Sequence, residues 1–126
     1  MAREKFKTLT EQMFYVLLAL KEECCGMDIM AKVSRITDGR ITVGSGTLYN
    51  LLEQFSAEGI ICETRTDGRR RSYILTEKGR DVLHREYQRL VTQAEDYCRV
   101  MDTATIEPSE ENISRQAAAV GLAPAY

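Results

Sequence analysis

Three consecutive arginines, Arg69, Arg70 and Arg71, directly follow the turn-forming pair Asp67-Gly68. Their guanidinium groups are permanently charged and have the planar geometry that binds phosphate oxygens in pairs. Residues 65–80 contain six basic and two acidic side chains, although the whole chain of 126 residues has a formal net charge of only -2. Because charged residues act through the local potential and not through the total charge, this segment is suited to a polyanion.

A group of uncharged polar side chains precedes the arginines on a segment with helical periodicity. The apolar residues of that segment recur at i, i+3, i+4 and i+7, which places them on one helix face: Leu48, Leu51, Leu52 and Phe55. No lysine or arginine lies between Gly44 and Glu58. Hydroxyl and amide groups bond to base edges and to phosphates, whereas arginines supply phosphate affinity. We therefore expect DNA contacts from two sets of residues, Ser45, Thr47, Tyr49 and Asn50 on the helix, and Arg69, Arg70 and Arg71 behind the turn.

Two helices are expected before these segments. Thr8 and Glu11 have the spacing of a capping box, and the apolar stripe behind them predicts a helix over residues 9–23. A second helix is expected after Gly26, and the pair at residues 38–39, Asp-Gly, predicts that it ends in a left-handed conformation.

The third helix is expected over residues 44–59, after a short β-prone segment at residues 40–43. The hydrophobic period then changes from that of a helix to that of a strand. Strands are expected over residues 60–65 and 70–75, joined by a hairpin turn at residues 67–68.

Strand geometry separates the three arginines. Successive residues of a strand alternate between its two faces, so Arg69 and Arg71 should point together and Arg70 oppositely. At least one arginine is therefore expected to face the body of the protein or to pair with an acid.

A long helix is expected from Thr76, a suitable N-cap, to Met101. Its apolar residues are spaced by four and three in alternation, which is the seam of a heptad repeat. A seam this long and narrow favours a partner helix over packing on the chain's own core. The expected interface of a homodimer comprises Phe14, Leu83, Tyr87, Leu90, Ala94, Tyr97 and Met101.

These elements in this order predict a mainly α protein of the α+β class: a winged helix-turn-helix with a long C-terminal dimerisation helix. We divide the chain into a DNA-binding domain (1–76), a dimerisation helix (77–101) and an acidic tail (102–126). Within the tail, Ile113, Ala117 and Val120 are spaced for a short helix, either docked or frayed.

Composition excludes several classes of protein. The four cysteines form no Cys-x-x-Cys pair and the one histidine is His84, so neither a metal site nor a cofactor is expected. No nucleophile, base or phosphate-binding glycine pattern indicates an enzyme. The chain lacks a run of apolar residues long enough to cross a membrane, and its N-terminus is unlike a secretory signal, so we expect a cytoplasmic protein. Vicinal Cys24-Cys25 is expected to pack at a helix end, with redox sensing as a minor alternative.

Three motifs together resemble the PadR family of bacterial transcriptional regulators. They are Gly-Thr-Leu-Tyr at residues 46–49, Glu-Gly-Ile-Ile at 58–61, and the run from Gly68 through Tyr-Ile-Leu-Thr to Gly79. The resemblance covers about residues 9–97 and implies a homodimeric winged helix protein, usually a repressor, of the subgroup with one long helix after the wing. Two positions depart from the family pattern, Met27 in place of Tyr and Asn50 in place of Pro.

The main hypothesis is a sequence-specific DNA-binding regulator that represses by binding a palindromic operator as a homodimer. The alternative is a winged helix adaptor whose acidic third helix meets a basic partner protein. The sequence identifies no small-molecule effector. Because the chain has no tryptophan, the aromatic-drug site of some short relatives is not carried over, and Phe14, Tyr87, Tyr97 and Met101 either pack plainly or line an interface pocket.

Overall fold

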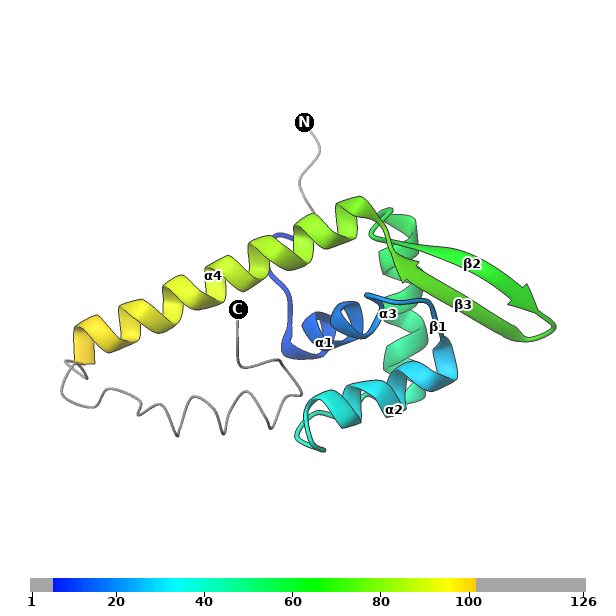
Figure 1. Cartoon of the computed structure of the whole chain (residues 1–126), viewed down its shortest axis with the longest axis horizontal. Coiled ribbons are helices and arrows are strands. Elements are labelled where there is room, and N and C mark those ends of the chain that lie inside the picture. The colour runs from blue at the N-terminus through cyan, green and yellow to red at the C-terminus, as the bar shows by residue number, and fades with distance from the viewer. Residues whose placement is uncertain (1–5, 102–126) are drawn as a thin grey trace.

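The computed structural model describes residues 6–101, so the acidic tail and its expected short helix lie outside the described residues. The order of elements is α1 (Glu11–Ala19), β1 (Cys24–Cys25), α2 (Gly26–Ile36), α3 (Ser45–Ala57), β2 (Ile61–Asp67), β3 (Arg70–Leu75) and α4 (Glu77–Met101) (Figure 1). The predicted α+β winged helix-turn-helix, with a long helix after the wing, is confirmed.

The core lies where α1, α2 and α3 meet the base of the sheet. The apolar face predicted for α3 is buried there, together with residues from every neighbouring element: Leu48, Leu52, Phe55, Val16, Leu17, Ile29, Val33, Ile60, Ile61 and Leu75. Apolar burial of this extent stabilises the domain by roughly 25 cal/mol for each Å² removed from water. The opposite face of α3 stays open to solvent.

The helix boundaries follow local hydrogen bonds, and one expectation was wrong. Thr10 and not Thr8 caps α1, because the Met13 backbone N–H donates to the Thr10 hydroxyl at 3.2 Å. The left-handed end predicted after α2 is present, with φ of 52° at Asp38 and 78° at Gly39. Gly59, with φ of 73°, ends α3 in the same way.

The sheet has three antiparallel strands in the order β1-β3-β2, and this corrects two expectations. Cys24 and Cys25 do not end a helix; they form β1 and pair with Tyr73 and Ser72 of β3. Residues 40–43, expected to be β-prone, are not a strand. Their backbone is held by side chains instead, since the Ile41 N–H donates to the buried Thr37 hydroxyl at 3.1 Å.

The start of α4 is joined tightly to the end of α3. The Gly79 N–H donates to the Thr76 hydroxyl at 3.0 Å, which makes Thr76 the expected N-cap. The Lys78 ammonium donates to the Glu58 carbonyl at 2.8 Å. A side chain at Gly79 would collide with the Ile60 carbonyl oxygen, so only glycine allows this approach. The joint therefore fixes the direction of α4 relative to α3.

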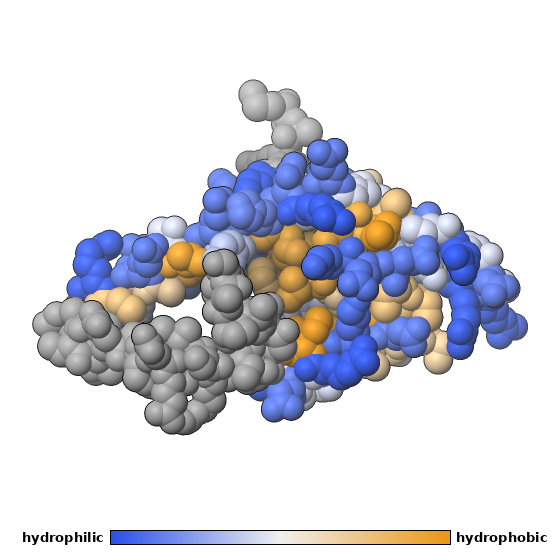
Figure 2. Space-filling model, viewed as in Figure 1, coloured by the Kyte–Doolittle hydropathy of each residue, from blue (hydrophilic) through white to orange (hydrophobic). Residues whose placement is uncertain are grey.

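Beyond this joint α4 runs across the domain and continues past it, away from the hairpin (Figure 1). Its buried residues are confined to the first part of the helix: Gly79, Val82 and Glu86. From Tyr87 onward every residue is exposed. Apolar residues remain visible on the part that extends away from the domain (Figure 2).

Candidate nucleic-acid interface

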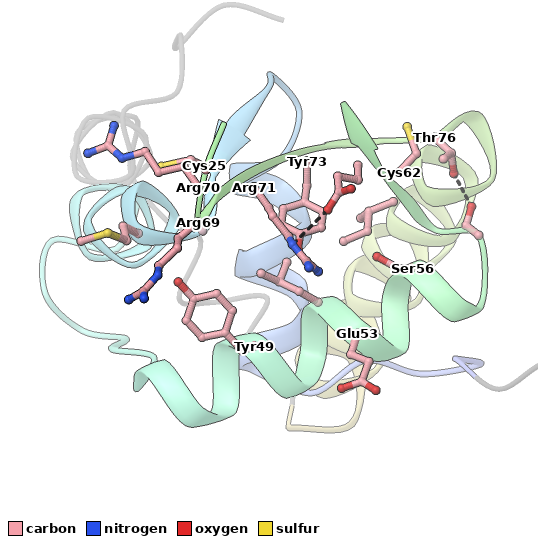
Figure 3. Close-up of a pocket in the computed structure, with 17 residues that line it drawn as sticks. Cys25, Tyr49, Glu53, Ser56, Cys62, Arg69, Arg70, Arg71, Tyr73 and Thr76 are labelled. Carbon is pink, nitrogen blue, oxygen red and sulfur yellow. Dashed lines mark hydrogen bonds and ion pairs between the residues drawn. The ribbon is translucent and has the colours of Figure 1, made fainter. Parts of the chain in front are cut away.

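A groove of about 1180 Å³ runs between α3 and the hairpin formed by β2 and β3. Its walls bring together residues that are distant in sequence, and the ring of Tyr49 on α3 projects toward the hairpin (Figure 3). Arg69, Arg70 and Arg71 line the same groove. The structure thus places the arginines next to the third helix, as the sequence-based hypothesis requires.

The hairpin turn lies one residue later than expected. Asp67 pairs with Arg70, which leaves Gly68 and Arg69 as the two turn residues. Gly68 has φ of 64°, whereas Arg69 does not have positive φ. This pattern fits a type II′ turn, which takes glycine at its first central position. Arg69 therefore sits at the tip of the wing and not on a strand.

The three arginines differ in their surroundings. Arg71 forms an ion pair with Glu63 across the hairpin, with 3.5 Å between its Nε and the Glu63 Oε1. In the described part of the chain, neither Arg69 nor Arg70 lies within ion-pair distance of an acid. The sequence predicts that at least one arginine faces the body of the protein or pairs with an acid, and Arg71 has such an acidic partner.

The directions of the side chains agree with the expected alternation. Arg69 and Arg71 extend toward the side of the hairpin that faces α3, and Arg70 extends away from it (Figure 3). Another basic residue of the hairpin, Arg65, lies 4.0 Å from Glu23. Two of the four hairpin arginines thus have internal acidic partners, and the two nearest the tip keep their charge available.

The four polar residues predicted on the recognition helix are all exposed on α3: Ser45, Thr47, Tyr49 and Asn50. Ser45 is the first residue of α3, and the helix begins there without a side-chain cap. Tyr49 leaves 48% of its surface exposed. These groups stand on the N-terminal half of the helix, which is the half that reads base edges in helix-turn-helix proteins.

Among the residues that sequence reasoning did not place in this groove are Gly26 and Met27, at the start of α2. Gly26 lies under the ring of Tyr49, and Met27 is 61% exposed beside it. Glu53 follows Tyr49 by one helical turn on the polar face of α3 and also lines the groove. Nothing in the sequence indicates that the start of α2 lies against Tyr49.

The predicted dimer residues fall into two groups. Phe14 on α1 and Leu83 on α4 are partly buried against the domain's own core. The remaining five are exposed in the single chain: Tyr87, Leu90, Ala94, Tyr97 and Met101. Val91 and Val100, which the heptad spacing omits, are also exposed at 40% and 73%.

One buried charge anchors α4 to the N-terminal segment. Glu86 is 4% exposed and accepts hydrogen bonds from the Leu9 N–H at 3.2 Å and from Arg89 at 2.6 Å. The hydrogen bond from Arg89 is the main reason that the pKa of Glu86 lies below its usual value. The carboxylate is therefore charged and fully bonded where α4 crosses the start of the domain.

No group of side chains suited to a metal ion is present among residues 6–101. In the same part of the chain no helix is both long and apolar enough to span a bilayer.

The family model described as the transcriptional regulator PadR-like family matches residues 16–85, more than half of the chain. A PadR family transcriptional regulator from Eggerthella lenta DSM 2243 has 21% identity and a TM-score of 0.62 over 73% of this chain and 82% of that chain. RosR from H. salinarum has 21% identity and a TM-score of 0.60, covering 81% of this chain and 99% of its own.

The PcaV transcriptional regulator from Streptomyces coelicolor, solved with its natural ligand, has 19% identity and a TM-score of 0.59. The alignment covers 87% of this chain and 74% of PcaV. At these identities the solved structures support the fold. No curated protein matches the chain.

Proposed function

Because the chain belongs to the PadR-like family of transcriptional regulators, we propose that it is a homodimeric repressor that binds a palindromic operator. The observation that carries the proposal is the difference in charge between the two sides of the groove, the wing and α3. Arg69 and Arg70 have no acidic partner among residues 6–101, and the facing surface of α3 is polar without a cation. A wing with free positive charge beside a polar helix without cations separates affinity for DNA from the reading of its sequence.

The wing supplies most of the affinity. Phosphate contacts by arginine release counterions, and this term is independent of base sequence. Arg71 contributes less than Arg69 and Arg70, because Glu63 already neutralises it. If each protomer neutralises about three to four phosphates, the slope of log K against log salt is roughly -5 to -7.

The exposed face of α3 supplies specificity. Asn50 offers an amide, which can bond to adenine with both its oxygen and its nitrogen. The hydroxyl groups of Ser45 and Thr47 are suited to base edges or to phosphate positioning. We expect Asn50→Ala to lower the difference in binding free energy between the preferred base and the other bases at one position by about 1–3 kcal/mol. The salt slope should stay unchanged. Binding to a set of single-base operator variants measures this.

The homodimer is supported by the exposed apolar residues of α4. Tyr87, Tyr97 and Met101 have 54%, 61% and 59% of their surface exposed in the single chain. In a dimer with a two-fold axis, the α4 helices of the two protomers would cover each other's exposed apolar residues. Two recognition helices on such a dimer bind half-sites separated by about one helical turn, or ~34 Å.

Electrophoretic mobility shift on the DNA upstream of the protein's own gene tests DNA binding directly. A shift that survives excess nonspecific DNA supports sequence-specific binding. Absence of a shift even at low salt favours the alternative, the protein-binding adaptor. Transcription in vitro from the bound promoter distinguishes a repressor, which lowers the amount of transcript, from an activator.

The wing is tested by reversing the two free charges. Arg69→Glu with Arg70→Glu removes about four phosphate contacts from a dimer, so affinity should fall roughly 10³-fold at 0.1 M salt on every DNA sequence. The matched control is Lys21→Glu with Arg80→Glu, which makes the same change in net charge at exposed positions outside the groove. An equal loss in both variants would assign the effect to overall charge and contradict the wing.

A further inference from the structure

The ring of Tyr49 lies directly on the backbone of Gly26, where α2 begins. A Cβ atom placed on Gly26 would lie 3.0 Å from Cε1 of the Tyr49 ring, 3.2 Å from its hydroxyl oxygen and 3.4 Å from Cζ. The first two separations are tighter than ordinary contacts to a Cβ atom. A side chain at residue 26 would therefore require the ring of Tyr49, with its hydroxyl, to move by at least a few tenths of an ångström.

The hydroxyl of Tyr49 is held in place without being bonded. Its ring has van der Waals contact with α2, yet no hydrogen bond from the hydroxyl is made within residues 6–101. In Figure 3 this hydroxyl points toward the hairpin, and Arg69 extends toward it from the wing tip. The Tyr49 hydroxyl and the Arg69 guanidinium, neither of which has a partner within residues 6–101, thus point into the same groove.

The backbone of Gly26 does not itself require glycine. Its φ is not positive, in contrast to those of Gly39, Gly59 and Gly68. Alanine at the first residue of a helix has a better helix propensity than glycine, by up to about 1 kcal/mol. The neighbour that a Cβ atom would displace is the Tyr49 side chain, so the contact with Tyr49 explains glycine at this position.

We propose that Gly26 is a positioning residue for DNA binding: it leaves the space in which Tyr49 lies, and so holds the Tyr49 hydroxyl beside Arg69 for a DNA phosphate. This inference rests on the proposed function and adds the start of α2 to the interface. Gly26 does not touch the phosphate. It acts through Tyr49, which connects the reading helix to the wing.

A double-mutant cycle between positions 26 and 49 tests the proposal. Gly26→Ala should weaken operator binding by up to about tenfold, because the displaced hydroxyl makes a longer and weaker hydrogen bond to DNA. In a chain that already carries Tyr49→Ala, the same Gly26→Ala change should have no effect on affinity, because the space above residue 26 is empty. Operator affinity of the four full-length proteins is measured by fluorescence anisotropy at fixed salt.

A second pair of variants isolates the hydroxyl group. Tyr49→Phe keeps the ring on Gly26 and removes only the oxygen, so it should weaken binding at least as much as Gly26→Ala does. Adding Gly26→Ala to Tyr49→Phe should then cost no further affinity. Thermal unfolding of each protein monitors the fold, and Gly26→Ala in the Tyr49→Ala chain should unfold at the same or a higher temperature.

The possible outcomes separate this inference from the proposed function. Equal loss of affinity from Gly26→Ala with and without Tyr49, or no loss in either chain, overturns the role of Gly26. Unchanged affinity in Tyr49→Phe overturns the hydroxyl contact, whereas the wing variant Arg69→Glu/Arg70→Glu would still report DNA binding. Absence of operator binding by the unaltered protein rejects the proposed function itself.

Discussion

The hairpin and the far part of α4 extend in opposite directions from the domain, and they expose opposite chemistry (Figure 1). The hairpin tip presents Arg69 and Arg70, which water solvates well. The end of α4 presents Tyr97, Val100 and Met101, which have between 59% and 73% of their surface exposed. Exposed charge is compatible with a free protein, whereas a row of exposed apolar residues indicates a partner that covers it.

Glu86 marks the point on α4 where the helix leaves the domain. Up to this residue α4 packs on its own domain, and beyond it every residue is exposed. Glu86 is bonded to the segment before α1 by the Leu9 N–H, which fixes the helix where it leaves the domain. The comparison therefore predicts three separable effects, on association, on stability and on affinity for DNA.

The largest effect is expected at the apolar end. Leu90→Glu with Tyr97→Glu places like charges opposite each other in the proposed dimer, which costs several kcal/mol. Sedimentation should then show a folded monomer at micromolar concentration, because neither side chain is buried within one chain. The control is Gln88→Glu with Thr92→Glu, which adds the same charge beside the seam and should remain dimeric. A dimer that persists in the Leu90/Tyr97 variant would remove α4 from the interface.

A smaller effect is expected at the base of α4. Glu86→Gln removes the ion pair with Arg89 from a buried position and should lower the free energy of unfolding by about 1–3 kcal/mol. Glu95→Gln makes the same charge change at an exposed site of α4 and should change stability by less than about 0.5 kcal/mol. Urea unfolding at neutral pH measures both.

The pH dependence of Glu86 has a definite sign. Its pKa is lowered on folding from the usual 4.5, so its contribution to stability is complete above that value. The contribution is lost as the pH falls from 4.5 through the lower pKa of the folded protein. The stability difference between the unaltered protein and Glu86→Gln should shrink over that interval, and a constant difference would contradict the role of the charge.

The smallest effect is expected within the hairpin. The ion pair between Arg71 and Glu63 is exposed, so Glu63→Gln should change the free energy of unfolding by at most about 1 kcal/mol. It should release Arg71 for phosphate and make the salt slope of a dimer steeper by roughly 1–2. Binding measured over a range of salt concentrations tests this, and an unchanged slope would contradict the claim that Glu63 limits phosphate binding by Arg71.

Local patterns predicted much of the fold correctly. The apolar face of α3, the left-handed end of α2 at Asp38-Gly39 and the cap of α4 at Thr76 each depend on residues within a few positions of one another. The failures arose where a distant segment decides the outcome. Cys24-Cys25 is a strand only because β3 supplies its partners, and in the segment 40–43 the Thr42 carbonyl accepts a hydrogen bond from the Gln12 side chain of α1.

The sequence alone determined the composition of the candidate site: three arginines behind a glycine turn, a polar helix face without cations, and a heptad seam. These follow from residue types and periods, which any fold of the chain must keep. Only the tertiary structure decided which arginines are free, because Glu63 reaches Arg71 across β2 and β3. It also brought Gly26 beneath Tyr49. Both contacts join separate elements, so packing sets them and local sequence does not.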